Sequence, residues 1–174
     1  MIVTGALVAC HTPLWINWLR EERSDLSVRL VLTPAAAGFV SEAALNALSP
    51  SPVVRDVWSS NGSALHVELS RWADAAVVYP CTMRYLARFA LGLTETPSLL
   101  ALEAFSGPVA VAPALPPGVG DGAAYAAHTA ALATRPNVTV VPPVPVRSST
   151  TGRYDAAGPP SLSKVLEALT LTRQ

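Results

Sequence analysis

The chain has 174 residues, a formal net charge of zero, 51% hydrophobic residues and only 14% charged residues. This length fits a single domain, residues 1–174, that buries about 70% of its unfolded surface. The balanced charge excludes a protein that binds nucleic acid through a basic footprint. No apolar run approaches the ~20 residues of a membrane span, so we expect no membrane partner.

The cysteines and the N-terminus indicate the compartment. Cys10 and Cys81 are too few for a disulfide framework. The first ten residues, MIVTGALVAC, lack the basic region of a signal peptide. We therefore expect a cytoplasmic protein. The low share of charged residues also suits a chain whose surface is partly covered by sister subunits.

Apolar runs and capping residues predict the elements of the first third of the chain. Residues 2–9 form an apolar run typical of a buried strand, and Thr12 is the expected N-cap of a helix that begins at Pro13. A second strand is expected at 28–32 and a helix at 35–48. The residues expected to face the core from these two helices are Leu14, Trp15, Trp18, Leu19, Phe39, Ala43, Ala44 and Leu48.

Residues 65–92 carry the strongest pattern. His66 is followed by an apolar strand at 75–79, a break at Pro80, a helix at 81–91 and a closing Gly92. Strand, proline, polar turn and helix describe a βα loop at the carboxyl edge of a parallel sheet. In open α/β sheets that edge binds ligands.

The remaining segments continue the alternation of strands and helices. We expect strands at 109–112 and 138–141, an irregular loop at 113–122, and a long irregular segment at 142–160. Helices are expected at 123–133 and at 161–171, the latter with Ser161 as N-cap. This alternation predicts an α/β protein with a doubly wound parallel sheet covered on both faces.

The order of these features resembles the homo-oligomeric flavin-containing cysteine decarboxylases. That family includes the epidermin-type lantibiotic peptidyl-cysteine decarboxylases and the phosphopantothenoylcysteine decarboxylases. The segment from Pro80 to Tyr85, PCTMRY, stands where the family has P-A-S-A-N-T, and the distance to Gly92 fits with no gap. The resemblance implies a flavodoxin-like three-layer α/β/α fold, a flavin cofactor (FMN or FAD), and no metal.

By the resemblance, three loops bind the flavin. Each loop also has a purely structural alternative. The first is the end of a core strand, and the second is a capped Ala-rich helix from which Phe39 packs into the protein core. Cys81, in the third, is either a nucleophile or a small buried hydrophobic residue. The residues that the resemblance assigns to the flavin are Gly5, Ala6, Thr12, Thr33, Ala36, Phe39, Pro80, Cys81, Thr82 and Met83.

His66 stands at the position of the family's catalytic histidine, which a neighbouring subunit contributes. An imidazole with a pKa near 6.5 suits a proton acceptor at neutral pH. The alternative is a core histidine with satisfied hydrogen bonds. The resemblance implies homo-oligomers built from trimers, up to a dodecamer, with sites at the subunit interfaces.

The substrate positions depart from the family in part. Arg84 replaces the family's asparagine; it either pairs with a carboxylate or is solvated like Arg88. Leu115 replaces the first methionine of the family's P-x-M-N-x-x-M-W, and the rest of that motif is missing after Pro113. The loss of this motif argues against a phosphopantothenoylcysteine decarboxylase.

Residues 148–154 resemble the S-S-G-R-Y segment of the epidermin-type enzymes. There a hairpin clamps the substrate peptide. By the resemblance the clamp covers about 143–160 and contacts substrate through Gly152, Arg153 and Tyr154; the alternative is a surface loop.

The resulting hypothesis is oxidative decarboxylation of the C-terminal cysteine of a ribosomally made precursor peptide, giving an enethiol for aminovinyl-cysteine formation. Alternatives on the same fold are a phosphopantothenoylcysteine decarboxylase, a flavin prenyltransferase, and a non-catalytic flavin-binding regulatory subunit.

Overall fold

The computed structural model describes residues 1–60 and 64–171. Its centre is a six-stranded sheet in the order β3-β2-β1-β4-β5-β6, and every neighbouring pair is parallel. This confirms the predicted doubly wound sheet. The strands are β1 (Ile2–Val3), β2 (Val31–Leu32), β3 (Val54–Arg55), β4 (Ala76–Thr82), β5 (Val109–Ala114) and β6 (Val138–Val140).

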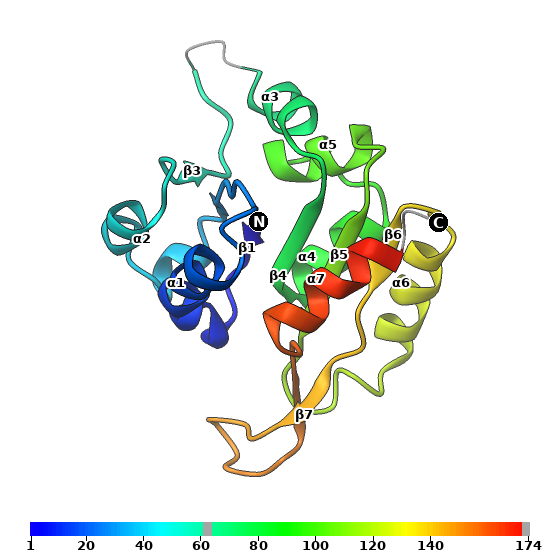
Figure 1. Cartoon of the computed structure of the whole chain (residues 1–174). Helices are drawn as coiled ribbons and strands as arrows, with labels where there is room; N and C mark the ends of the chain where they lie inside the picture. The colour runs from blue at the N-terminus through cyan, green and yellow to red at the C-terminus, as the bar shows by residue number, and fades with distance from the viewer. Residues whose placement is uncertain (61–63, 172–174) are drawn as a thin grey trace.

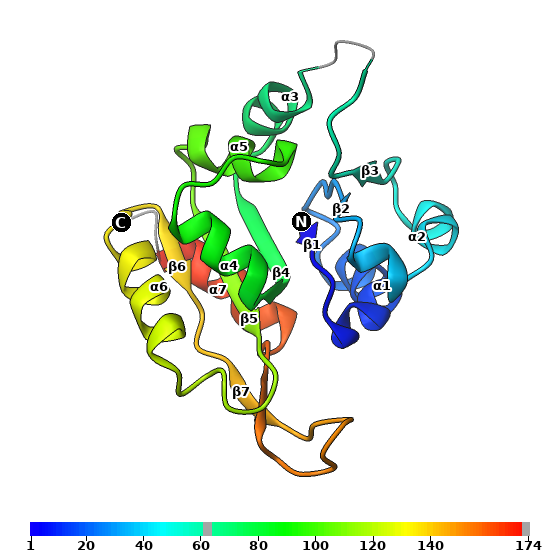
Figure 2. The same cartoon turned by 180° about the vertical axis from the view of Figure 1, so that it is seen from behind.

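Helices cover both faces of the sheet and complete a three-layer α/β/α fold (Figures 1 and 2). One face carries α1 (Thr12–Glu22), α2 (Glu42–Leu48) and α7 (Leu162–Leu171). The other face carries α3 (Leu65–Trp72), α4 (Met83–Ala90), α5 (Pro97–Ala104) and α6 (Ala123–Ala133). Among the described residues no helix combines the length and the apolar character that crossing a bilayer requires.

The two-residue period of the strands divides the core between the layers. In β4, Val78 packs with α4 and α5, whereas Val77 and Tyr79 pack with α1 and α7. Alternate side chains of a strand point to opposite faces, so a strand buried on both faces must be apolar throughout. That is why 109–112 and 75–79 are recognisable as strands from sequence alone.

The N-terminal strand is shorter than expected. The strand predicted at 2–9 is wrong beyond Val3, because the chain turns at Gly5 and enters the 3₁₀ helix η1 (Leu7–His11). That helix runs directly into α1, so Thr12 is not an N-cap; its hydroxyl donates to the Ala9 carbonyl instead, at 2.6 Å.

Two predicted core faces need correction. Leu14 is 65% exposed, and Ile16 takes its place in the core. The helix expected at 35–48 is two pieces, the 3₁₀ turn η2 (Ala36–Gly38) and α2, whose N-cap is Ser41. Phe39 falls between the pieces and is 40% exposed, Ala43 and Ala44 are exposed as well, and Leu45 is fully buried.

Pro80 does not break its strand. β4 continues through Pro80 to Thr82 with an irregular register against β5, and α4 begins only at Met83. Two helices were not predicted: α3, which contains His66, and α5, which follows Gly92. Gly92 itself has φ = 67°, which confirms its expected role after a helix.

The segment 142–160 contains a two-stranded antiparallel hairpin, β7 (Val144–Val146) and β8 (Ala156–Gly158). The hairpin projects beyond the carboxyl end of β4, and α3 lies at the opposite end of that strand (Figures 1 and 2).

Candidate functional site

Three loops meet where β1, β2 and β4 end. Strand β1 lies between β2 and β4, so the loops that follow these three strands share one edge of the sheet. Gly5 permits the closest approach among them: a Cβ there would lie 2.6 Å from the Cβ of Ala35 and 2.8 Å from its backbone carbon. Only glycine therefore allows the first loop to touch the second.

Two buried threonines hold these loops together. Thr33 donates its hydroxyl to the Val3 carbonyl at 3.1 Å and accepts the Ala36 amide at 3.3 Å, so it joins the second loop to the first. Thr4 joins the first loop to the third through Pro80 and Thr82. Thr4 was not predicted from the sequence; its position between a strand and Gly5 is the only local signal for it.

The N-terminus of α4 faces this edge. The Thr82 hydroxyl caps the helix by accepting the Tyr85 amide at 3.3 Å. Met83 and Arg84 occupy the first two positions of α4, where the backbone amides have no acceptor within the helix itself. Free amides at a helix start favour an electron-rich ligand atom.

The structure divides the predicted flavin residues into two groups. Gly5, Ala6, Thr33, Ala36, Phe39, Pro80, Thr82 and Met83 lie on or beside the three loops. Thr12 is completely buried with its hydroxyl already bonded. Cys81 is also completely buried, and this burial raises the pKa of its thiol far above the usual range, so the thiol stays protonated and is a poor nucleophile.

Arg84 differs from its neighbour on α4. Arg84 is exposed, and no hydrogen bond or ion pair joins its guanidinium to any residue that the structure describes. Arg88, one turn later, bonds Glu95 at 3.0 Å. The guanidinium of Arg84 therefore lies in the first turn of α4 available for an anion.

His66 is not brought to the three loops within one chain. It lies in the first turn of α3, beside the indole of Trp58, with ring centroids 5.5 Å apart. Its Nδ1 is buried and has no hydrogen-bond partner among the described residues. An unbonded buried nitrogen of this kind is costly for the fold and calls for a partner beyond the residues that the structure describes.

The hairpin is attached to the wall of the site at its base. Leu115, which is 4% exposed, exchanges two backbone hydrogen bonds with Ala157 of β8, at 2.7 and 3.1 Å. The hydroxyl of Tyr79 in β4 donates to the Pro160 carbonyl at 2.8 Å. The hairpin is therefore fixed to β4 and to the end of β5.

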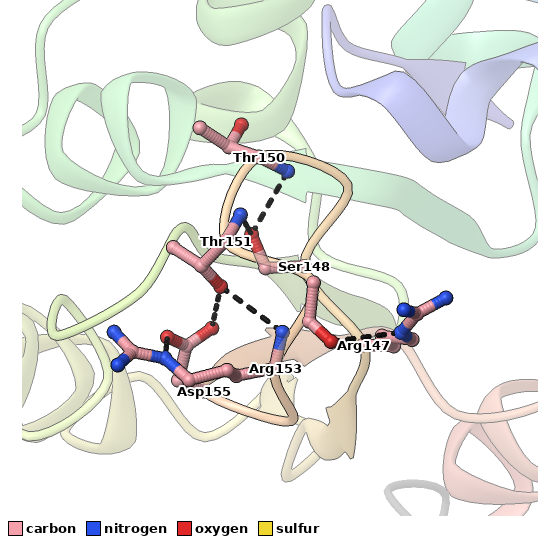
Figure 3. Close-up of polar contacts among 7 residues, drawn as sticks. Arg147, Ser148, Thr150, Thr151, Arg153 and Asp155 are labelled. Carbon is pink, nitrogen blue, oxygen red and sulfur yellow. Dashed lines mark hydrogen bonds and ion pairs between the residues drawn. The ribbon is translucent and has the colours of Figure 1, made fainter.

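The tip of the hairpin is folded by its own polar side chains (Figure 3). The Ser148 hydroxyl accepts the amides of Thr150 and Thr151, both at 3.2 Å. Asp155 accepts the Thr151 hydroxyl at 2.7 Å and the Arg153 Nε at 3.2 Å. The predicted clamp is thus an ordered turn, although the guanidinium expected to meet a substrate already has a partner.

Gly152 and Tyr154 complete the tip. Gly152 has φ = 71°, the conformation that the turn requires, and its carbonyl accepts the Arg147 Nε at 2.8 Å. Tyr154 is 76% exposed and so presents its ring to solvent.

A buried polar network between β3, α4 and α5 was not predicted from the sequence. Asp56 follows β3 and is 1% exposed; its two carboxylate oxygens accept the amide and the hydroxyl of Ser98. The same serine oxygen lies 2.7 Å from the Tyr85 hydroxyl. Since Asp56 already bonds the Ser98 hydroxyl, Tyr85 is the donor to Ser98. The network ties β3, α4 and α5 together.

Comparison with known proteins identifies the family. The flavoprotein family model matches residues 1–170. The cypemycin cysteine dehydrogenase (decarboxylating) of a Streptomyces species is 31% identical over 144 residues, which are 82% of this chain and 74% of that protein. The bifunctional coenzyme A biosynthesis protein CoaBC of Escherichia coli is 33% identical over 135 residues, covering 76% of this chain but only 33% of CoaBC.

Solved structures agree with the fold. The crystal structure of the cypemycin decarboxylase CypD has a TM-score of 0.80 and 28% identity over 99% of this chain and 90% of CypD. The FMN-dependent cysteine decarboxylase TvaF from thioviridamide biosynthesis has a TM-score of 0.75 and 26% identity over 99% of this chain and 94% of TvaF. The resemblance inferred from the sequence is confirmed, and the chain belongs to the flavoprotein family.

Proposed function

We propose that the chain is a flavin-dependent decarboxylase that acts on the C-terminal cysteine of a precursor peptide. The observation that carries this proposal is the hairpin bonded through Leu115 and Ala157 to the end of β5, at the same end of the sheet as the three loops. A preformed arm beside a cofactor pocket suits a substrate that extends away from the reacting residue. The similarity to the cypemycin enzyme supports the same reading.

The three loops fit a flavin. Gly5 lets the first loop lie close to the second, and the N-terminus of α4, at Met83 and Arg84, favours an anionic or carbonyl oxygen. We assign Gly5, Ala6, Thr33, Ala36, Pro80, Thr82 and Met83 to holding it, and Phe39, exposed beside the second loop, to covering it. When bound, the flavin supplies the two-electron oxidation of the cysteine side chain that prepares loss of carbon dioxide.

Arg84 is the residue that we assign to the substrate carboxylate. It is exposed and unpaired within the described residues, whereas Arg88 and Arg153 already bond Glu95 and Asp155. A guanidinium binds a carboxylate through two parallel hydrogen bonds, which orients as well as attracts it. Leu115 forms the apolar wall, and Tyr154 covers the peptide when the hairpin tip binds it.

His66 is the proposed base that accepts the thiol proton. The unbonded Nδ1 and the position of α3 at the far end of β4 both favour action on a neighbouring subunit's site. We therefore propose a homo-oligomer built from trimers. Trp58 lies beside the imidazole and is 49% exposed, so it presents an apolar surface to such an interface.

The proposal is tested by incubating the flavin-loaded protein with peptides that end in cysteine and measuring their mass. Loss of carbon dioxide together with two hydrogens supports it. Conversion of phosphopantothenoylcysteine but of no peptide favours the coenzyme A branch, to which the CoaBC similarity also points. Flavin binding without any turnover favours the regulatory subunit. A protein that binds no flavin overturns all three.

A further inference from the structure

The hydroxyl of Thr4 fills both of its hydrogen-bonding roles with the same short segment. It donates to the Pro80 carbonyl at 2.7 Å and accepts the Thr82 amide at 2.9 Å. The Thr4 amide also donates to the Pro80 carbonyl, at 3.3 Å. Thr4 is 2% exposed, so solvent does not compete with these bonds.

The regular backbone pairing of β1 with β4 stops before Thr4. The regular pairing of β1 with β4 is limited to Ile2 and Val78. Beyond it, β1 ends at Val3, and β4 becomes irregular between Val78 and Cys81. The Thr4 hydroxyl takes over where the backbone ladder stops and fixes the end of β4 to the end of β1.

The atoms held in this way belong to two of the flavin loops. On one side, Thr4 precedes Gly5, whose contact with Ala35 sets the position of the second loop. On the other side, Thr82 is the N-cap of α4, and the first turn of that helix, with Met83 and Arg84, follows directly. One hydroxyl therefore sets the distance between the Gly5 loop and the start of α4.

We propose that Thr4 is a positioning residue for the flavin site: its hydroxyl holds the α4 N-terminus in register with the Gly5 loop, and flavin affinity depends on it. The inference rests on the proposed flavin site and goes beyond it by assigning a role to a residue that touches only other protein groups. Serine keeps both hydrogen bonds, whereas valine keeps the shape of threonine and loses both.

The test is titration of FMN into flavin-free wild type, Thr4→Val and Thr4→Ser proteins, followed by flavin fluorescence, with thermal unfolding of each flavin-free protein measured in parallel. Because two bonds disappear, we expect Thr4→Val to raise the Kd for FMN at least tenfold, which corresponds to ~1.4 kcal/mol. Thr4→Ser should stay within threefold of wild type. Thr4→Ala serves as a second hydroxyl-free variant if Thr4→Val does not fold.

Tyr79→Phe is the matched control. It removes a different buried hydroxyl, the one in β4 that donates to the Pro160 carbonyl, so it lowers stability without removing a bond between the loops. Its Kd for FMN should stay within threefold of wild type. The inference is overturned if Thr4→Val or Thr4→Ala binds FMN like wild type, or if Tyr79→Phe weakens FMN binding as much as they do. If wild type itself binds no FMN, the proposed function fails instead.

Discussion

The carboxylate of Asp56 and the first turn of α5 are joined at Ser98, whose amide and hydroxyl donate to the two carboxylate oxygens at 2.8 and 2.7 Å. The pair lies 42 residues apart in the chain and is completely shielded from solvent. A helix N-terminus stabilises a negative charge, so α5 and Ser98 together keep a buried carboxylate favourable. Tyr85 extends this link to α4.

Removing the serine hydroxyl should destabilise the fold. Ser98→Ala leaves the Tyr85 hydroxyl and one Asp56 oxygen without a partner, and we expect a loss of about 1–3 kcal/mol in the free energy of unfolding. Ser163→Ala, at an exposed serine, is the control and should change little. Ser98 and Tyr85 share one network. The double variant Ser98→Ala/Tyr85→Phe should therefore lose less free energy of unfolding, measured in urea, than the two single variants lose in sum. Additive costs would show that the network does not act as a unit.

A side chain added at Gly5 should push the first two loops of the site apart. Gly5→Ala places a Cβ 2.6 Å from Ala35, and overpacking of this kind costs about 1–3 kcal/mol. We expect a lower unfolding temperature and a weaker affinity for FMN. Gly38→Ala is the matched control, since it lies near the second loop with no atom within 4 Å of the added Cβ. Equal behaviour of the two variants would contradict the close approach.

The role of Arg84 is tested with two peptides and three proteins. A C-terminal acid should bind wild type at least about tenfold more tightly than the matching amide, since a charge-assisted hydrogen bond contributes roughly 1.5–3 kcal/mol. Arg84→Ala should remove that preference. Arg88→Ala should retain it, because Arg88 is paired with Glu95. An unchanged acid-to-amide ratio in Arg84→Ala would move the carboxylate contact elsewhere, with Arg153 as the next candidate.

His66→Asn should keep bound flavin and the oligomeric state while turnover falls by ~10²–10⁴, the usual contribution of a general base. His128→Asn, in α6 and on another part of the surface, is the control and should leave turnover unchanged. Single-turnover kinetics with the cysteine peptide give the measurement. Wild-type turnover in His66→Asn would make His66 a structural residue that packs against Trp58.

The two cysteines should differ sharply in reactivity. Cys10 is exposed, whereas burial of Cys81 raises the pKa of its thiol and keeps it protonated at neutral and mildly alkaline pH. Iodoacetamide at pH 8 should therefore add one group per native chain and a second only after denaturation. Mass spectrometry of the Cys10→Ser variant, which should remain unlabelled while folded, assigns the site. Rapid labelling of Cys81 in the native protein would instead support a role for Cys81 as a nucleophile.

Local chemistry in the sequence determined much of this fold. Apolar runs located β4 and β5 because strands buried on both faces must be apolar throughout. Gly92 and Gly152 take the positive φ angles expected of glycine after a helix and in a turn. The hydroxyl of Ser161 accepts the Lys164 amide, as an N-cap should. These signals involve residues within a few positions of one another.

Only the tertiary structure decided what depends on distant partners. The hydroxyl of Thr4 meets the Thr82 amide across 78 positions, and no local pattern specifies such a pair. Phe39 and Leu14 are apolar yet exposed, because neighbouring elements bury Leu45 and Ile16 instead. His66 lies in α3, which precedes β4, whereas the three loops lie at the opposite, carboxyl end of that strand. The direction of β4 therefore separates the two parts of the proposed site within one chain.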